Sequence, residues 1–300
     1  MDTSNGFLPP HDQRARWTRE WHEAEGFGWS ASVRVGSSCA PLVVLLHGTG
    51  ADGSSWNTLV PHWPEHWTVW VLDLPGHGAS PAPARGRAMG IAELGASLAT
   101  LLSRHSLADR RGVLVGHSAG AAVALAALST LEARSPQVRG WHLIGLAPSL
   151  IIPPALYTLA LGPVLAPILL SRPSLWLMES SIRVPGVIEA IVRSTGSPLP
   201  PERMHAMAAL LRAPGHLEGA LRFMSDSQLE SVLERGREVR APMALLAARD
   251  DPWIPLTQVQ QAAERFLPQA VLSTWPSGGH LFHEHQPEAT AHWVADWIAA

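Results

Sequence analysis

A serine between two glycines is the first candidate for chemistry in this 300-residue chain. The residues Gly116-His117-Ser118-Ala119-Gly120 follow the apolar run GVLV and open an alanine-rich stretch. Glycines at these two positions allow a tight turn from a strand into a helix, which lifts the serine hydroxyl clear of the backbone. The N-terminus of the following helix favours negative charge that develops beside it. The pattern predicts a nucleophile at Ser118.

A serine nucleophile needs a base and a carboxylate that orients the base. His280 follows the apolar run AVLST, and Asp251 follows the run PMALLA. The chain order serine, acid, histidine is typical of sheets that carry this kind of serine turn. Each of the three residues comes just after a predicted strand, where α/β sheets place their sites. Asp250 is the rival acid, but the local pattern over residues 248–255 favours Asp251.

Acyl transfer also needs two backbone N–H groups that face the oxyanion. Ala119, the residue after the nucleophile, is expected to supply one. The other is expected from the loop His47-Gly48-Thr49-Gly50, which follows the first buried apolar run. Thr49 is the first choice and Gly50 the second.

The same loop satisfies a different motif. Gly48-Thr49-Gly50-Ala51-Asp52-Gly53 matches G-x-G-x-x-G, and Asp73 lies 20 residues beyond Gly53 at the end of the next strand. This is the fingerprint of dinucleotide binding, and it makes a dehydrogenase an alternative. That alternative leaves the matching positions of Ser118, Asp251 and His280 as coincidences.

Composition excludes several other kinds of site. All 22 basic residues are arginine, which excludes a P-loop lysine, a Schiff-base lysine and a serine–lysine dyad. Cys39 is the only cysteine, so an internal disulfide, a multi-cysteine zinc site and an iron–sulfur cluster are excluded. His280, His283 and His285 lie close in sequence, but no H-E-x-x-H motif is present, and we predict neither a metal site nor a cofactor. A net charge of −3 disfavours nucleic acid as a partner.

Alternating strands and helices are expected to position these residues. Continuous apolar runs suit strands buried on both faces of a parallel sheet; they are Pro41–Leu46, Thr68–Leu72, Gly112–Val115, Trp141–Leu146, Pro242–Ala247 and Ala270–Thr274. The alternating run Ser30–Val35 predicts an edge strand. Helical patterns occupy Ala88–Ser103, Ala119–Leu131, Leu256–Phe266 and Pro287–Ala299. This alternation predicts an α/β fold with a doubly wound, mostly parallel sheet.

The alternation stops between Leu150 and Met224, a stretch rich in apolar residues and prolines. We interpret it as an inserted helical cap, which divides the chain into core residues 1–149, cap residues 150–225 and core residues 226–300. The cap is expected to form an apolar pocket above Ser118. Trp176 in the cap and Trp253 beside the acid are the predicted substrate-binding residues.

The expected location is the cytoplasm, because the N-terminal residues show no secretory signal and the chain has one cysteine. One stretch leaves membrane association open. Residues 140–171 carry no charge and are long enough to cross a bilayer. Five prolines interrupt the stretch, which favours a buried strand followed by cap helices.

Taken together, the motifs resemble the α/β-hydrolase fold superfamily over residues 30–148 and 226–300. The resemblance is carried by His47-Gly48, the run Asp73–Ser80, the turn Gly116–Gly120, Asp251 and Gly279-His280. It implies eight strands in the doubly wound sheet, an inserted helical cap and an esterase-like serine hydrolase. One departure concerns the glutamate that many relatives have before the Gln-Pro after the catalytic histidine. Here that position is His285, preceded by Glu284.

Residues 194–225, with HGTGADGSSW and VGHSAGAA, resemble the magnesium-chelatase accessory hydrolases of bacteriochlorophyll biosynthesis. This resemblance implies a role in photosynthesis beside magnesium insertion, association with magnesium chelatase, and a porphyrin or pigment intermediate as the bulky hydrophobic substrate. Arginines of the cap could pair with porphyrin propionates. The alternative is a non-catalytic protein that uses the same fold to bind a porphyrin or to assist assembly.

Overall fold

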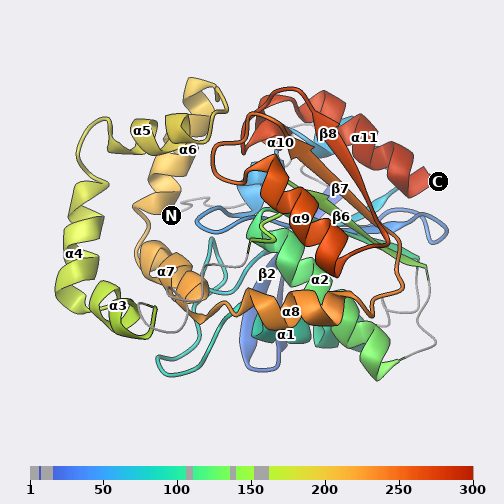
Figure 1. The fold of residues 1–300 in the computed structure, drawn as a ribbon, viewed down its shortest axis with the longest axis horizontal. Helices are drawn as coiled ribbons and strands as arrows, with labels where there is room; N and C mark the ends of the chain where they lie inside the picture. Colours follow the sequence, from blue (N-terminus) through green and yellow to red (C-terminus); the bar gives the residue numbers. More distant parts are fainter. Residues whose placement is uncertain (1–6, 8–15, 106–110, 136–139, 152–161, 300) are drawn as a thin grey trace.

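The computed structural model describes residue 7 and residues 16–105, 111–135, 140–151 and 162–299. One eight-stranded sheet runs through these residues in the order β1-β2-β4-β3-β5-β6-β7-β8 (Figure 1). The strands are β1 Trp17–Ala24, β2 Phe27–Arg34, β3 Leu42–Leu46, β4 Thr68–Asp73, β5 Gly112–His117, β6 Trp141–Leu146, β7 Met243–Ala248 and β8 Ala270–Trp275. All pairs from β4 to β8 are parallel, whereas β2 is antiparallel to both β1 and β4. The mostly parallel α/β sheet is confirmed.

The first two strands correct one prediction. Ser30–Val35 was expected to form an edge strand, but β2 lies between β1 and β4, and β1 is the edge. The register pairs Trp17 with Arg34 and Ala24 with Phe27, so β1 covers the whole free side of β2. Most side chains of β2 are buried, several of them in the apolar core on one face of the sheet, whereas half of those in β1 are exposed.

Helices cover both faces of the sheet. On one face, α1 (Ile91–Arg104), α2 (Ala119–Arg134), α8 (Leu229–Gly236) and α9 (Leu256–Phe266) bury their apolar sides against alternate strand residues. On the other, α11 (Pro287–Ala299) and the 3₁₀ turn Val60–His62 pack on the remaining strand residues. Alternate residues of each central strand therefore belong to two separate apolar cores, which explains why these strands read as continuous apolar runs.

Among the described residues, five helices lie between β6 and α8, on the left in Figure 1. They are α3 Gly162–Leu169, α4 Arg172–Ser181, α5 Val187–Ser194, α6 Pro201–Leu211 and α7 His216–Asp226. We call residues 162–226 the helical segment. It has a small apolar core of its own around Ile182, Ile188 and Val192. No helix among the described residues is both long and apolar enough to cross a membrane.

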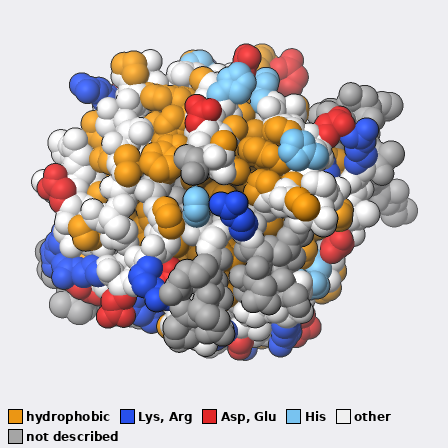
Figure 2. Space-filling view, turned by 90° about the vertical axis from the view of Figure 1, so that its right-hand side faces the viewer, with side chains coloured by type: hydrophobic (Ala, Val, Ile, Leu, Met, Phe, Trp, Pro, Cys, Tyr) orange, Lys and Arg blue, Asp and Glu red, His pale blue; other side chains and the backbone are white. Residues whose placement is uncertain are grey.

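Figure 2 shows the end of the molecule that faces away from the helical segment. Hydrophobic side chains gather across the middle of this face, with charged side chains mainly around them. A shallow cavity of about 90 Å³ is lined by residues at the starts of β3, β5 and β6, including Gly112 and His142. The candidate catalytic residues come from the opposite ends of the parallel strands.

Candidate active site

The turn at Ser118 joins β5 to α2, and its backbone has an unusual conformation. Ser118 has φ 51° and ψ −120°, a region that residues with a side chain seldom adopt. A Cβ added to Gly116 would lie 2.4 Å from the backbone nitrogen of Ala121. A Cβ added to Gly120 would lie 2.3 Å from the carbonyl oxygen of Leu46. The two glycines thus let strand, turn and helix approach closely enough to hold Ser118 in this conformation.

Ser118, His280 and Asp251 meet at the carboxyl ends of their strands. The Ser118 Oγ lies 3.1 Å from His280 Nε2, and His280 Nδ1 lies 2.8 Å from Asp251 Oδ2. His280 and Asp251 are buried, whereas Ser118 is half-buried. A carboxylate only accepts hydrogen bonds, so the imidazole proton belongs on Nδ1 and Nε2 can accept the serine proton. The sequence prediction that these three residues lie together agrees with this geometry; their catalytic roles stay predictions.

The two neighbouring aspartates bind different groups. Asp251 uses Oδ1 to accept the backbone N–H groups of Trp253 and Ile254, at 2.8 and 2.9 Å. These bonds fix the carboxylate while Oδ2 faces His280. Asp250 instead accepts the N–H groups of the two glycines that precede His280, at 2.9 and 3.1 Å. Asp251 is therefore the carboxylate in contact with the imidazole.

The loop after β3 lies against the serine turn. A Cβ added to Gly48 would be only 3.1 Å from the Ser118 Cβ, so the backbone of this loop directly adjoins the nucleophile. Ala119 is the first residue of α2, and the N–H groups of a first helical turn have no acceptor within the helix. Thr49 follows Gly48 in the adjoining loop. Both predicted oxyanion donors thus belong to backbone segments next to Ser118.

A histidine of α7 holds the far side of this loop. The N–H of Gly78 donates to His216 Nδ1 at 3.3 Å, so the ring proton belongs on Nε2 and is donated to the carbonyl of Gly50 at 3.0 Å. Burial lowers the pKa of His216, which keeps the ring neutral. The helical segment therefore contacts the loop that carries the predicted oxyanion donor.

Asp73 is turned into the protein rather than toward a ligand. Its carboxyl group accepts the N–H of Gly53 at 2.7 Å and that of Ala79 at 2.9 Å. Burial, helped by the charge of Asp52, raises the pKa of Asp73 to about 7. The residues after the glycine motif form a 3₁₀ turn of four residues, Gly53–Trp56, rather than a long helix. These contacts argue against the dinucleotide alternative, because the acid that would bind ribose is already occupied.

Of the two tryptophans predicted to line a substrate site, one adjoins the base. The Trp253 ring lies 5.3 Å from the His280 ring, between centroids, and 47% of the residue is exposed. Trp176 lies on α4 and is 68% exposed. Among the described residues it makes no hydrogen bond or ring contact with Ser118, Asp251 or His280. Its substrate-binding role stays a prediction without structural support.

Of the two histidines that follow His280, His283 packs inside the core and His285 is exposed. His283 is fully buried with its ring 4.1 Å from that of His117, and burial lowers the pKa of both well below the usual value. Within the described ranges, no group of three or more His, Cys, Asp or Glu residues could hold a metal ion. Glu284, which precedes the departure from the superfamily pattern at His285, is buried and forms an ion pair with Arg203 of α6.

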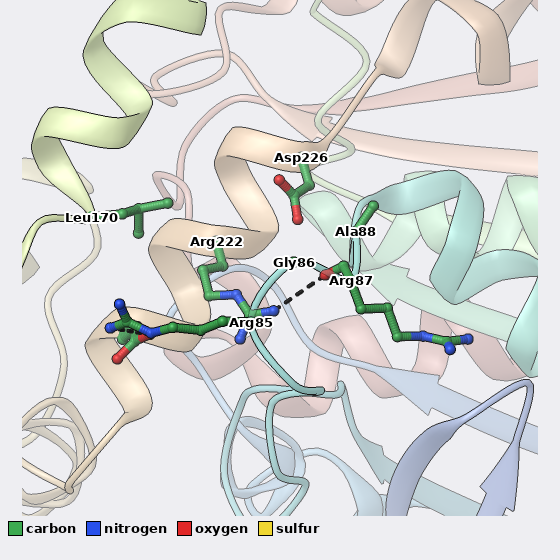
Figure 3. A pocket seen from close by; sticks show the side chains of 8 residues that line it. Arg85, Gly86, Arg87, Ala88, Leu170, Arg222 and Asp226 are labelled. Carbon is green, nitrogen blue, oxygen red and sulfur yellow. Dashed lines mark hydrogen bonds and ion pairs between the residues drawn. The ribbon is translucent and has the colours of Figure 1, made fainter.

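A cavity of about 340 Å³ lies between residues 85–88, Leu170 and α7 (Figure 3). None of its lining residues belongs to the serine, acid and histidine group. Arg222 points across it and donates to the carbonyl of Arg87, and also to Pro83 and Ala84. Arg85 forms an ion pair with Glu218 at 2.9 Å. Arg222, an arginine of the predicted cap, is therefore bonded within the protein, and the cavity is not the apolar pocket expected above Ser118.

Sequence reasoning missed the residues that hold the site from the helical segment. His216, Thr195 and Ser197 are buried, and each bonds to a loop of the site. They lie within residues 194–225, whose resemblance to a family assigns no role to single residues, and they are 80 or more residues along the chain from their partners in these loops. The small residues and prolines around Ser197 and before His216 signal only that the chain turns there.

Comparison with known proteins gives a consistent result. The model of the "Alpha/beta hydrolase family" matches residues 43–293. The "Magnesium-chelatase 30 kDa subunit" of Rhodobacter capsulatus is 31% identical over 271 residues, covering 89% of this chain and 89% of that protein. The "Pimeloyl-[acyl-carrier protein] methyl ester esterase" of Aromatoleum aromaticum is 30% identical over 268 residues, 86% of this chain and 98% of that protein.

Solved structures show the same architecture. A thermophilic esterase from Thermogutta terrifontis superposes with a TM-score of 0.70, covering 94% of this chain and 98% of that one. Its sequence is 20% identical, so the likeness concerns the fold.

Proposed function

Because the chain belongs to the alpha/beta hydrolase family, we propose that it is a serine hydrolase that cleaves an ester-like bond. The observation that carries this proposal is the chain of hydrogen bonds from Asp251 through His280 to Ser118, at 2.8 and 3.1 Å. A serine hydroxyl at this distance from an imidazole nitrogen has the geometry that proton removal requires. The strained backbone at Ser118 supports the same role, since such strain concentrates at functional sites.

The proposed reaction has two steps. His280 takes the proton of Ser118 as the oxygen attacks a carbonyl carbon, while Asp251 orients the imidazole and stabilises its charged form. The backbone N–H groups of Ala119 and Thr49 bind the oxyanion, and protonated His280 gives its proton to the leaving alcohol or thiol. His280 then activates water, which releases the acid and restores Ser118.

We propose a bulky hydrophobic substrate, with Trp253 beside the base as a contact and residues 150–225 as a cap over the site. The supporting observation is the ring of Trp253 against His280, with about half of its surface open to contact. Aromatic faces of this kind bind apolar or planar groups.

We further propose that the protein acts as an accessory factor beside magnesium chelatase in bacteriochlorophyll biosynthesis, on a porphyrin or pigment intermediate. Identity of 31% over nearly the full length of a protein named as a magnesium-chelatase subunit supports this proposal. The esterase relative of similar identity supports hydrolysis of an ester.

Labelling with a fluorophosphonate probe tests the serine hydrolase. Ser118 should form a covalent adduct, which mass spectrometry locates, and Ser118→Ala should abolish it. Ser231→Ala is the matched control, because Ser231 is exposed on α8 and bonds only locally to the carbonyl of Gln228. Labelling of another serine while Ser118 stays unmodified would refute the assignment.

The second candidate is a binding protein without turnover, and the chelatase name of the relative favours it. In that case folded protein would bind a porphyrin, quench tryptophan fluorescence and leave Ser118 unlabelled. Ser118→Ala would then bind the porphyrin with unchanged affinity and support magnesium insertion as well as the unmodified protein does.

A further inference from the structure

The backbone N–H groups of the loop that carries His280 are bound by two separate parts of the chain, while the carbonyl oxygen of His280 lies 3.0 Å from His117 Nε2 of β5. We call residues 277–281 the base loop. The N–H groups of Gly278 and Gly279 donate to the carboxylate of Asp250, which follows β7. This first attachment belongs to the sheet and keeps the start of the base loop next to the loop that carries Asp251.

The second attachment comes from the helical segment. The N–H of His280 donates to the carbonyl of Thr195 at 2.7 Å, and the N–H of Leu281 donates to Ser197 Oγ at 2.8 Å. Ser197 in turn donates its hydroxyl proton to the carbonyl of Gly278 at 2.6 Å. One hydroxyl therefore joins residues on both sides of His280 and closes the base loop around it.

The two backbones are in close contact at this point. A Cβ added to Gly279, which has φ +64°, would lie 2.4 Å from the carbonyl carbon of Gly196 and 2.6 Å from Ser197 Oγ. A Cβ on Gly196, with φ +72°, would lie 3.2 Å from the side chain of Pro252, which follows Asp251 in the loop after β7. Residues 195–197 thus lie between the loops that carry the acid and the base.

We propose that Ser197 is a positioning residue for His280, so that the helical segment fixes the geometry of the base as well as lying beside the site. This inference rests on the proposed function. Ser197 and Thr195 are each only 3% exposed, so water does not readily replace their bonds to the base loop. Without the Ser197 hydroxyl, the carbonyl of Gly278 and the N–H of Leu281 lose this partner. The backbone on both sides of His280 can then shift, which changes the distance of the imidazole from Ser118.

The variant Ser197→Ala tests this role. We expect the rate constant for fluorophosphonate labelling of Ser118 to fall ten- to a hundredfold, since small displacements of a catalytic group cost rate on this scale. With an ester such as p-nitrophenyl butyrate, kcat should fall while KM changes little, because Ser197 is buried behind the base. Ser197→Thr, which keeps a hydroxyl, should recover most of the lost rate. Ser181→Ala is the matched control, since Ser181 is exposed on α4 and its hydroxyl donates locally to the carbonyl of Met178.

Rates are to be compared at a temperature at which melting curves show each variant folded. If Ser197→Ala does not fold, Ser197→Cys, similar in size but with a weaker donor, takes its place and should show an intermediate rate. Wild-type labelling rates and an unchanged kcat in a folded Ser197→Ala or Ser197→Cys protein would overturn the positioning role and leave the hydrolase intact. Failure of the unmodified protein to label at Ser118 would instead reject the proposed hydrolase.

Discussion

At the scale of single residues, the adjacent carboxylates Asp250 and Asp251 have separate tasks. Asp251→Asn should lower turnover by on the order of 10⁴-fold, because an amide cannot stabilise the charged imidazole and favours the wrong tautomer. The bond to His280 Nδ1 at 2.8 Å is the contact that is lost. Steady-state hydrolysis of a small ester measures the effect.

Asp250→Asn is the comparison for that experiment. It retains one acceptor for the two glycine N–H groups, so it should lower stability by about 1–3 kcal/mol and leave much more of the turnover. Loss of turnover in Asp250→Asn with an active Asp251→Asn would mean that the acid is Asp250.

The sequence predicts these residues unequally, and the reason is distance along the chain. Ser118, Asp251 and His280 each follow a recognisable apolar strand, so local patterns locate them. Ser197 and His216 act through contacts with residues far away in sequence, at Gly278 and Gly50. The sequence around a small polar residue in a loop does not indicate its distant hydrogen-bond partner. Such residues are identified only from the folded structure, in which the two loops are adjacent.

At the scale of elements, the contact of α2 with the end of β3 depends on Gly120. In Gly120→Ala the new Cβ would lie 2.3 Å from the Leu46 carbonyl oxygen and 2.5 Å from that of His47, so strand and turn must separate. We expect a loss of about 1–3 kcal/mol in unfolding free energy, as for other overpacked positions, and a sharply reduced labelling rate at Ser118.

Gly86→Ala is the control that separates the effect of a steric clash at the new Cβ from the effect of backbone strain. Gly86 has φ +91° but nothing lies within 4 Å of its added Cβ. The Gly86→Ala protein should have a lower free energy of unfolding and the same labelling rate at Ser118 as the unmodified protein. Equal labelling by both glycine variants would show that the close approach at Gly120 does not determine the position of Ser118.

The elements also show where sequence patterns fail. The continuous apolar runs match the observed strands that are buried on both faces. The predicted helix Ala119–Leu131 corresponds to α2, which extends over Ala119–Arg134. Strand β1 was missed because its residues WTREWHEA are polar and partly exposed, with no apolar run to mark them. Strand β1 forms because it pairs with the free edge of β2. A sequence pattern within one segment does not show which strand that segment will pair with.

At the scale of the whole molecule, four buried histidines make stability depend on pH. Burial lowers the pKa of His47 to about 4 and those of His77, His117 and His283 well below the usual value. Unfolded histidines bind protons below pH about 6.5, so the unfolded state gains protons that the folded state excludes. Unfolding free energy therefore falls as pH falls below about 6.5.

One buried acid opposes this trend. Burial raises the pKa of Asp73 to about 7, so Asp73 keeps a proton in the folded state that the unfolded state has lost. Burial also raises the pKa of Glu284, but the charge of Arg203 beside it favours the ionised form. Four histidines against one acid leave a net fall in unfolding free energy as the pH decreases from 6.5 to 5.5. Urea unfolding at pH 7.5, 6.5 and 5.5 measures this slope.

His283→Phe is the informative variant for that slope. His283 is fully buried, and neither ring nitrogen has a hydrogen-bond partner among the described residues. Without the titration of His283, the fall in unfolding free energy between pH 6.5 and 5.5 should be smaller by about 1 kcal/mol. The same slope in both proteins would show that His283 does not contribute to the loss of stability in acid.

The divided attachment of the base loop has a consequence for hydrogen exchange. The amide protons of Gly278 and Gly279 are protected by Asp250, whereas those of His280 and Leu281 are protected by residues 195–197. Local opening of a protein exchanges the amides whose acceptors leave, and the others stay protected. Four consecutive amides should therefore divide into two kinetic pairs. Opening of the helical segment exposes only the second pair, and the protection of His280 reports how often the base is released from the helices beside it.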